Sequence, residues 1–252
     1  MFVKNNLKRG IINRDMLISL IASVICLVIG GYESLIIYKQ NSYVNAFFSS
    51  LTNGTSSIMA LVFPIIACIP YAASYAEEKV SGYLNYVIIK VNKKKYIRTK
   101  ILSCALSGGL AVGVPALVFL IACIWCKGTQ LSSTQSEYYY ITHAVGLFDR
   151  SPIFYCLLYV LNFFLCGAIF ALIGLAVSVY INNKYLIHII PFAIYILLAM
   201  LMANININLN PVTLYDINSY AESSLVFNSI YKIVIMIVPM YIFAHGVKIY
   251  EE

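Results

Sequence analysis

The chain has 252 residues, of which 61% are apolar and only 11% are charged. Soluble domains carry roughly 25% charged residues, so this composition excludes an ordinary water-soluble fold. The net charge of +7 does not indicate a nucleic-acid partner, because the basic residues occupy short segments between long apolar runs rather than a separate basic domain.

Six apolar runs predict an all-α membrane protein with six transmembrane helices in a single transmembrane domain, residues 1–252. A helix rises about 1.5 Å per residue and the hydrocarbon layer is about 30 Å thick, so a run of about 20 apolar residues is long enough to cross. The predicted spans are residues 16–38, 56–76, 101–126, 152–181, 185–203 and 229–246. Residues 1–15 are basic, and the spacing of Val3, Leu7 and Ile11 predicts a short interfacial helix there.

Proline and glycine give some of these spans a predicted shape. Pro64 and Pro70 interrupt the hydrogen bonding of the second run and predict a kinked helix. Gly109 and Gly113 form a G-x-x-x-G pattern in the third run, which predicts a close approach to another helix. Pro152 opens the fourth run, at a position where its missing N–H has no consequence.

The distribution of basic residues predicts the orientation of the chain. With six spans, the side that holds both termini collects 13 of the 17 Lys and Arg residues, and this excess is typical of the cytoplasmic side. We therefore expect both termini in the cytoplasm. The opposite side keeps Lys39, Lys127, Arg150 and Lys232.

Sequence motifs give little support to an enzyme. No Gly-x4-Gly-Lys-Ser/Thr pattern occurs, so the chain has no phosphate-binding loop and we expect it to bind no nucleotide cofactor itself. H-E-x-x-H is also absent, and the three histidines (His143, His188 and His245) lie far apart in sequence, so no metal site is predicted.

Two pairs of residues could have either a catalytic or a structural role. Glu77 and Glu78 could act as acid and base in an intramembrane enzyme, but we favour their placement at the start of a polar helix, where negative charge complements the helix dipole. Cys123 and Cys126 have the C-x-x-C spacing of thiol oxidoreductases, but they end an apolar run. Two buried thiols one turn apart are the favoured interpretation.

A few polar residues are candidates for a transport pathway, since polar groups inside a membrane often mark one. Asn162 lies deep in the fourth span and Glu33 near the outer end of the first. Asn206 and Asn208 belong to the asparagine-rich segment 204–211. That segment is either a re-entrant lid over a pathway or an ordinary outer loop, and the sequence does not separate the two.

The most informative segment lies between the second and third spans. Its first part contains Glu77, Glu78, Ser81, Gly82, Tyr83, Leu84, Asn85 and Tyr86. Its second part is a basic patch made of Lys93, Lys94, Lys95, Arg98 and Lys100. Together they resemble the permease subunits of ABC-2 type ATP-binding cassette transporters, in which Glu78, Gly82, Lys95, Tyr96 and Lys100 match the pattern. Val91 and Asn92 stand where that family often has a proline.

The resemblance implies a function and a set of partners. Residues 81–86 would form a cytoplasmic coupling helix that docks on a separate ATPase subunit, present in two copies, which would bind ATP and Mg. A second permease subunit, identical or related, would complete the translocation path of an exporter in the plasma membrane of a bacterium. The alternatives are an ion-driven secondary carrier, an intramembrane enzyme, and, for the helix itself, contact with anionic lipid headgroups.

Overall fold

The computed structural model describes residues 2–37, 42–53, 58–129, 131, 145–206, 209–215 and 225–249. All regular structure in these ranges is helical. Five helices are long and apolar enough to cross a membrane, and these are α2 (Arg14–Tyr32), α7 (Lys93–Lys127), α9 (Pro152–Val177), α10 (Lys184–Ile205) and α12 (Leu225–Ile249). The chain is therefore an all-α, multi-pass membrane protein.

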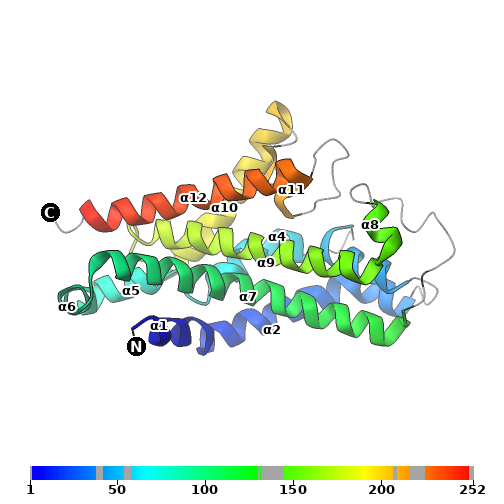
Figure 1. Cartoon of the computed structure of the whole chain (residues 1–252), viewed down its shortest axis with the longest axis horizontal. Helices are drawn as coiled ribbons and strands as arrows, with labels where there is room; N and C mark the ends of the chain where they lie inside the picture. The colour runs from blue at the N-terminus through cyan, green and yellow to red at the C-terminus, as the bar shows by residue number, and fades with distance from the viewer. Residues whose placement is uncertain are drawn as a thin grey trace.

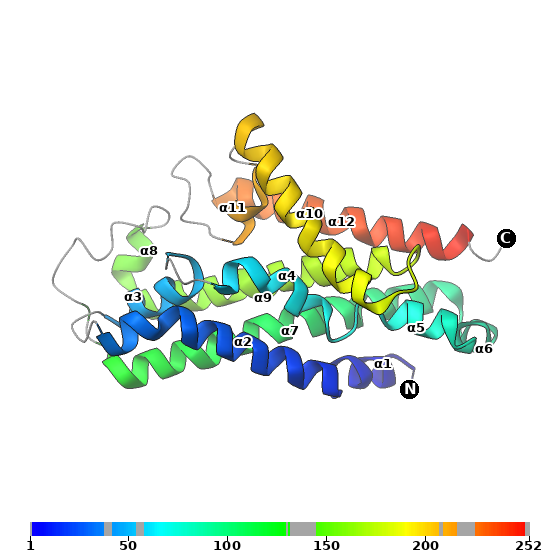
Figure 2. The same ribbon diagram turned by 180° about the vertical axis from the view of Figure 1, so that it is seen from behind.

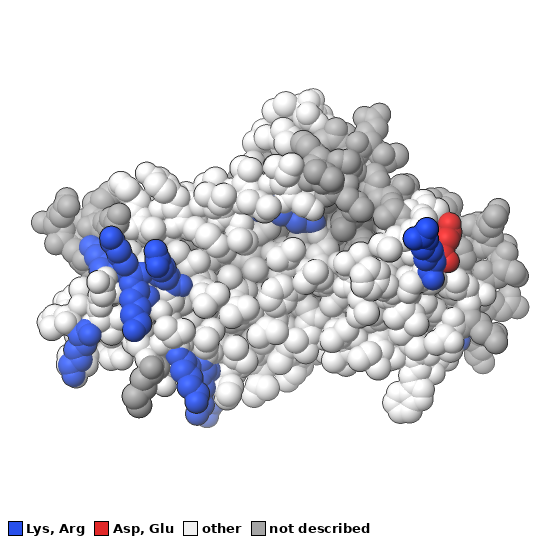
Figure 3. Space-filling view, in the orientation of Figure 1, with Lys and Arg blue, Asp and Glu red and all other residues white. Residues whose placement is uncertain are grey.

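The remaining described elements are shorter. They are α1 (Phe2–Ile11), α3 (Tyr43–Phe48), α4 (Ile58–Cys68), α5 (Ser74–Val80), α6 (Tyr83–Lys90), α8 (Val145–Arg150), α11 (Pro211–Tyr215) and the π-helical turns Glu33–Ile37 and Ser49–Asn53. Helices α1, α5 and α6 lie at one end together with both ends of the chain, and α3 and α8 lie at the other (Figure 1). Lys and Arg side chains gather at the first of these, which we name the basic end (Figure 3).

Close packing of α7 against α9 forms the centre of the bundle. A Cβ added to Gly108 would lie 2.9 Å from the backbone oxygen of Gly167, and one added to Gly167 would lie 2.7 Å from that of Gly108. A Cβ added to Gly109 would lie 2.7 Å from the phenyl ring of Phe164 in α9. The close approach predicted from the G-x-x-x-G pattern is confirmed, with glycine on both helices allowing the backbones to meet.

The second predicted span is broken in two rather than kinked. Helix α4 ends at Cys68, a turn follows at residues 69–73, and α5 begins at Ser74. Pro70 explains the break, because it has no N–H to donate and disfavours helical geometry in the residue before it. The 11 residues of α4 rise only about 16 Å, and the turn and α5 carry the chain on to the basic end (Figure 2).

The third predicted span begins earlier than expected. The basic patch at residues 93–100 forms the first turns of α7 instead of a separate loop, so this helix has 35 residues and a length of about 52 Å. Asn92 explains the start, because its side chain accepts a hydrogen bond from the backbone N–H of Lys94 at 3.0 Å and caps the helix.

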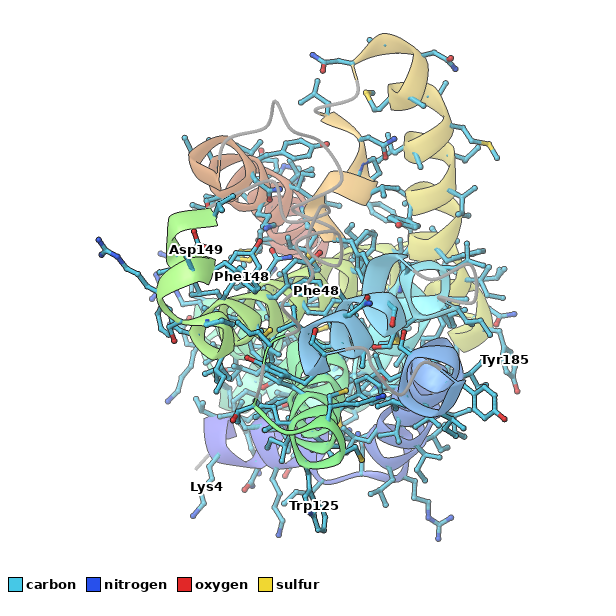
Figure 4. The ribbon with its side chains drawn as sticks, turned by 90° about the vertical axis from the view of Figure 1, so that its right-hand side faces the viewer. Lys4, Phe48, Trp125, Phe148, Asp149 and Tyr185 are labelled. Atoms are coloured by element: carbon cyan, nitrogen blue, oxygen red, sulfur yellow. The ribbon has the colours of Figure 1, made fainter. Side chains whose placement is uncertain are left out.

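Aromatic side chains fill the end of the bundle opposite the basic end. Phe48 of α3 packs edge-to-face on Tyr159 of α9, and Phe148 of α8 packs in the same way on Tyr155. Seen along the bundle, Phe48 and Phe148 point inward, whereas Trp125 points away from the helices (Figure 4). The short helices α3 and α8, which the sequence analysis did not predict, therefore close this end of the core.

Candidate functional site

A buried carboxylate at the basic end joins three helices. Only 3% of the Glu78 side chain in α5 is exposed, and its Oε1 atom lies 2.8 Å from Nη1 of Arg9 in α1. The same oxygen lies 2.9 Å from Nζ of Lys100 in α7, a side chain with no exposed surface. One carboxylate thus neutralises two cations that come from opposite sides of it.

Neutral side chains complete this network. Tyr96 donates its hydroxyl proton to the other carboxylate oxygen at 2.7 Å. The ammonium group of Lys100 donates to the hydroxyl groups of Tyr71 at 3.2 Å and Ser74 at 3.1 Å, and Tyr71 donates in turn to Oδ1 of Asn6 at 2.6 Å. We name Asn6, Arg9, Tyr71, Ser74, Glu78, Tyr96 and Lys100 the Glu78 network.

Electrostatics make this network sensitive to any change in charge. Breaking a buried ion pair leaves an uncompensated charge and costs about 3–5 kcal/mol. Partial burial alone lowers the pKa of the Arg9 guanidinium, but the nearby Glu78 carboxylate outweighs burial and raises that pKa above its ordinary value. Arg9 therefore stays charged at every physiological pH.

Glu77 and Glu78 do not form a shared acid–base pair. Glu77 is half exposed and lies 3.4 Å from Nζ of Lys184, whose second partner is Asp15 of α2 at 2.8 Å. Glu78 points into the protein instead. Of the two, only Glu77 matches the predicted position in the first turn of a polar helix.

Helix α6 projects from the bundle next to the Glu78 network. It begins after Gly82, whose φ of +71° is a left-handed conformation that favours glycine and turns the chain between α5 and α6. Ser81 and Asn85 are exposed. Leu84 is buried in the hydrophobic cluster that also contains Val87 and Tyr96, so it attaches α6 to the bundle.

The outer face of α6 carries exposed apolar side chains. Tyr83, Tyr86 and Ile89 are 46%, 54% and 85% exposed, and we name these three residues the α6 outer face. Lys90 lies over the ring of Tyr86, with its ammonium 4.3 Å from the ring centre. Apolar groups this exposed on a short helix at the polar end of a membrane protein are typical of an interaction surface.

The basic patch divides into two environments. Lys94, Lys95 and Arg98 are exposed, and they line a groove of about 450 Å³ between α1 and α7. Lys93 is half-buried. Lys100 is separated from this surface altogether, because it is an interior member of the Glu78 network.

A second polar site lies inside the bundle. Asn162 of α9 is buried and donates from Nδ2 to the backbone oxygen of Tyr215 at 3.1 Å, and its Oδ1 accepts a hydrogen bond from the ammonium of Lys232. Lys232 of α12 is 8% exposed. The sequence analysis counted it with the basic residues of the side opposite the termini, but it falls within the predicted span 229–246 and its side chain is buried in the bundle.

The asparagine-rich segment is partly packed into the protein. Asn206 is exposed at the end of α10, while Asn208 and the side chain of Glu33 lie outside the described residues. Helix α11, which follows, buries Tyr215 between Phe63 and Phe163 at ring-centre distances of 4.8 and 4.9 Å. Helix α11 is therefore anchored in the aromatic core of the bundle.

Potential metal ligands and thiols are dispersed in the described part of the chain. No three His, Cys, Asp or Glu side chains among those residues come together as a metal site. Cys123 is buried and Cys126 is exposed, and both are free thiols. The prediction of two buried thiols is therefore right for Cys123 and wrong for Cys126, which faces outward near the end of α7.

Sequence analysis missed several members of these sites. Asn6 and Arg9 lie about 70 residues before Glu78, so no local pattern identifies them, and Tyr71 lies in the break between α4 and α5. The two sites therefore stand on geometry, and no relative supplies a function for them. Comparison of this chain with family models, curated proteins and solved structures finds no match in any of the three.

Proposed function

We propose that this chain is the permease subunit of an ABC-2 type ATP-driven exporter in a bacterial plasma membrane. It would form half of a translocation path with a second permease subunit, identical or related. Two copies of a separate ATPase subunit, which bind ATP and Mg, would dock at the basic end. The support is the sequence pattern at residues 78–100 together with the position of that segment in the structure.

One observation carries the proposal: an exposed apolar helix projects from the bundle directly beside a buried ionic network. Tyr83 and Tyr86 of the α6 outer face offer aromatic groups of the kind that dominate interface energies. Glu78 lies four residues before Gly82, so α6 and the Glu78 network are parts of one short structural unit. A partner that moves α6 would act on helices of the bundle through that unit.

The mechanism would transmit a movement as a rigid body. Glu78 holds α5 to α1 through Arg9 and to α7 through Lys100. Docking and release of an ATPase would therefore shift these helices together and bias the path between two arrangements. ATP supplies the driving energy in the partner, and the present chain supplies the contact surface and the linkage.

Topology is consistent with this arrangement. The start of α1 and the end of α12 both lie at the basic end, which supports an even number of crossings (Figure 1). The five long helices need one more, and α4 with the following turn and α5 would provide it. We propose six crossings with the basic end in the cytoplasm, because positive charge accumulates on that side.

Co-purification tests the proposal. The full chain is expressed in membranes together with a candidate ATPase encoded beside it. The double substitution Tyr83→Glu, Tyr86→Glu in α6 is compared with the control Tyr185→Glu, which changes an exposed tyrosine in a different helix, α10. We expect the double variant to lose the ATPase on purification and the control to retain it. Equal recovery of the ATPase with both variants would reject docking through α6.

Lys232 favours one second candidate, an ion-driven secondary carrier. Such a carrier needs an ionisable residue at membrane depth, and Lys232 is one. Proteoliposomes containing the chain alone separate the two functions. Transport driven by an imposed ion gradient without any ATPase would support the carrier, whereas dependence on the ATPase would support the exporter.

A further inference from the structure

Lys232 differs from every other buried charge in the described residues. Its ammonium donates to the amide oxygen of Asn162, a neutral group, and it forms no ion pair with any acidic side chain that the structure describes. Lys100, the other buried lysine, has Glu78 at 2.9 Å. Lys232 therefore carries a positive charge into the bundle without a described countercharge.

A purely structural role does not explain this charge. Removing an ion from water costs several kcal/mol even after the protein relaxes, and one amide oxygen recovers only part of that. A neutral side chain of similar size would fill the same space at lower cost. Charged groups at membrane depth are rare for this reason, and they usually face a substrate or an ion.

An apolar groove begins beside Lys232. It has a volume of about 460 Å³ and lies between α9, α10 and α12. Tyr231 and Ile235, which flank Lys232 along α12, line it together with Ile173 of α9 and Leu198 of α10. Helix α10 crosses the other helices obliquely (Figure 2), and it contributes Ile194 and Leu198 to the lining of the groove.

Lys232 does not itself line the groove, but its neighbours Tyr231 and Ile235 on α12 do, so the lysine lies at the edge of the helix face that forms the groove. The groove offers apolar walls of a volume suited to a small molecule or an alkyl chain. The lysine has a flexible four-carbon stem, so its ammonium can turn toward a group at the groove's edge while Asn162 keeps its hydrogen bond to the backbone of Tyr215. An anion there would neutralise the only buried charge that lacks a described carboxylate.

We propose that Lys232, Asn162 and this groove bind an amphipathic anion, with its apolar body in the groove and its carboxylate or phosphate on Lys232. This inference deepens the proposed function, because such an anion would be the transported molecule. The binding itself requires no ATPase. A test on the isolated chain therefore fails or succeeds independently of docking through α6.

The first experiment measures binding to the full chain in phosphatidylcholine nanodiscs, with empty nanodiscs subtracted. The probes are radiolabelled dodecanoate and dodecyl phosphate, with neutral dodecanol and inorganic phosphate for comparison. We expect both amphipathic anions to bind saturably, Lys232→Met to weaken them at least tenfold, and Lys232→Arg and the exposed control Lys8→Met to leave them nearly unchanged. Dodecanol should bind the native chain and Lys232→Met equally.

Several results would overturn the inference. Equal binding of the anions by the native chain and Lys232→Met is one, and displacement by inorganic phosphate alone is another, because it would show a site for a free anion without an apolar part. If binding of the probes is too weak to measure, the melting temperature of the chain without ligand provides a second test. Since Lys232→Met removes an uncompensated charge, its melting temperature without ligand should equal or exceed that of the native chain.

The same measurement distinguishes a partner within the chain. Asp216→Asn and Glu222→Gln remove the two acidic residues that precede α12 in sequence. If either substitution and Lys232→Met both lowered the melting temperature by similar amounts, the lysine would be part of an internal ion pair and the inference would be wrong. We expect neither to change stability and neither to change binding of the anions.

Discussion

Glu78 and Lys100 form an ion pair of 2.9 Å in which both side chains are almost completely buried. They belong to α5 and α7, and the exposed helix α6 lies between those two helices in sequence. The contact therefore closes a short loop of structure around α6 at the basic end. Because buried pairs of this kind are costly to separate, α5 and α7 should move as one unit.

Glu78→Gln should destabilise the protein strongly. The substitution removes the countercharge of Lys100, whose side chain has no exposed surface, and the expected loss of unfolding free energy is about 3–5 kcal/mol. Titration of purified protein from mild detergent into a denaturing one, followed by circular dichroism, measures this loss.

Glu77→Gln is the matched control for that substitution. Glu77 is half exposed, and its contact with Lys184 is a surface ion pair, so its loss should cost less than about 1 kcal/mol. If the two neighbouring substitutions had equal effects, the Glu78 network would not be a stabilising element.

Gly108→Ala should weaken the packing of α7 on α9. The new methyl group would lie 2.3 Å from Cβ of Ala171 and 2.9 Å from the backbone oxygen of Gly167, so the helices must separate, at a cost of about 1–3 kcal/mol. Gly146→Ala in α8 is the control, because no atom lies within 4 Å of its added Cβ. A thermal scan that ranks Gly108→Ala at or above Gly146→Ala would contradict the close approach.

Gly82→Ala tests whether the direction of α6 matters for the proposed docking. No atom would contact the added methyl group, but a φ of +71° disfavours alanine by about 1–2 kcal/mol, so α6 should change its angle to α5. We expect weaker co-purification of the ATPase. Gly128→Ala, which also replaces an uncrowded glycine with positive φ, lies at the other end of α7 and should not affect it.

Cysteine labelling tests the orientation. Cys126 is exposed near the end of α7 remote from the basic end, whereas Cys123 is buried, so a membrane-impermeant maleimide added to intact cells should label the first and spare the second. Ser81→Cys, introduced beside α6 in a Cys126→Ser background, should react only in inverted membrane vesicles. Labelling of Ser81→Cys in intact cells would reverse the proposed topology.

The sequence predicted the elements that depend on local chemistry. Apolar run lengths located the five long helices, and Gly109 indicated the close contact of α7 with α9. Pro152 was correctly placed at the start of a helix. In each case a few neighbouring residues contain the whole signal, because hydrophobic length, backbone flexibility and proline geometry act locally.

The sites depend on contacts between distant segments, and these could not be predicted. Glu78 was expected at the start of a polar helix, and its burial follows from contact with Arg9, 69 residues away. Lys232 was counted with the charges of the side opposite the termini, and its burial follows from the hydrogen bond to Asn162, 70 residues away. Pro70 was expected to bend a helix and instead ends it, since the outcome depends on whether neighbouring helices can bond to the freed carbonyl groups.

The unusual length of α7 gives the molecule a lever. Its 35 residues run from the Glu78 contact near one end to Cys123 near the other without a gap in the helix. The part of α7 from Lys100 to Lys127 spans about 40 Å, so a tilt of about 5° around the contact with Glu78 would carry its far end through roughly 3.5 Å. A small rotation produced where the polar helices meet would thus become a displacement as wide as a water molecule on the other side of the lipid.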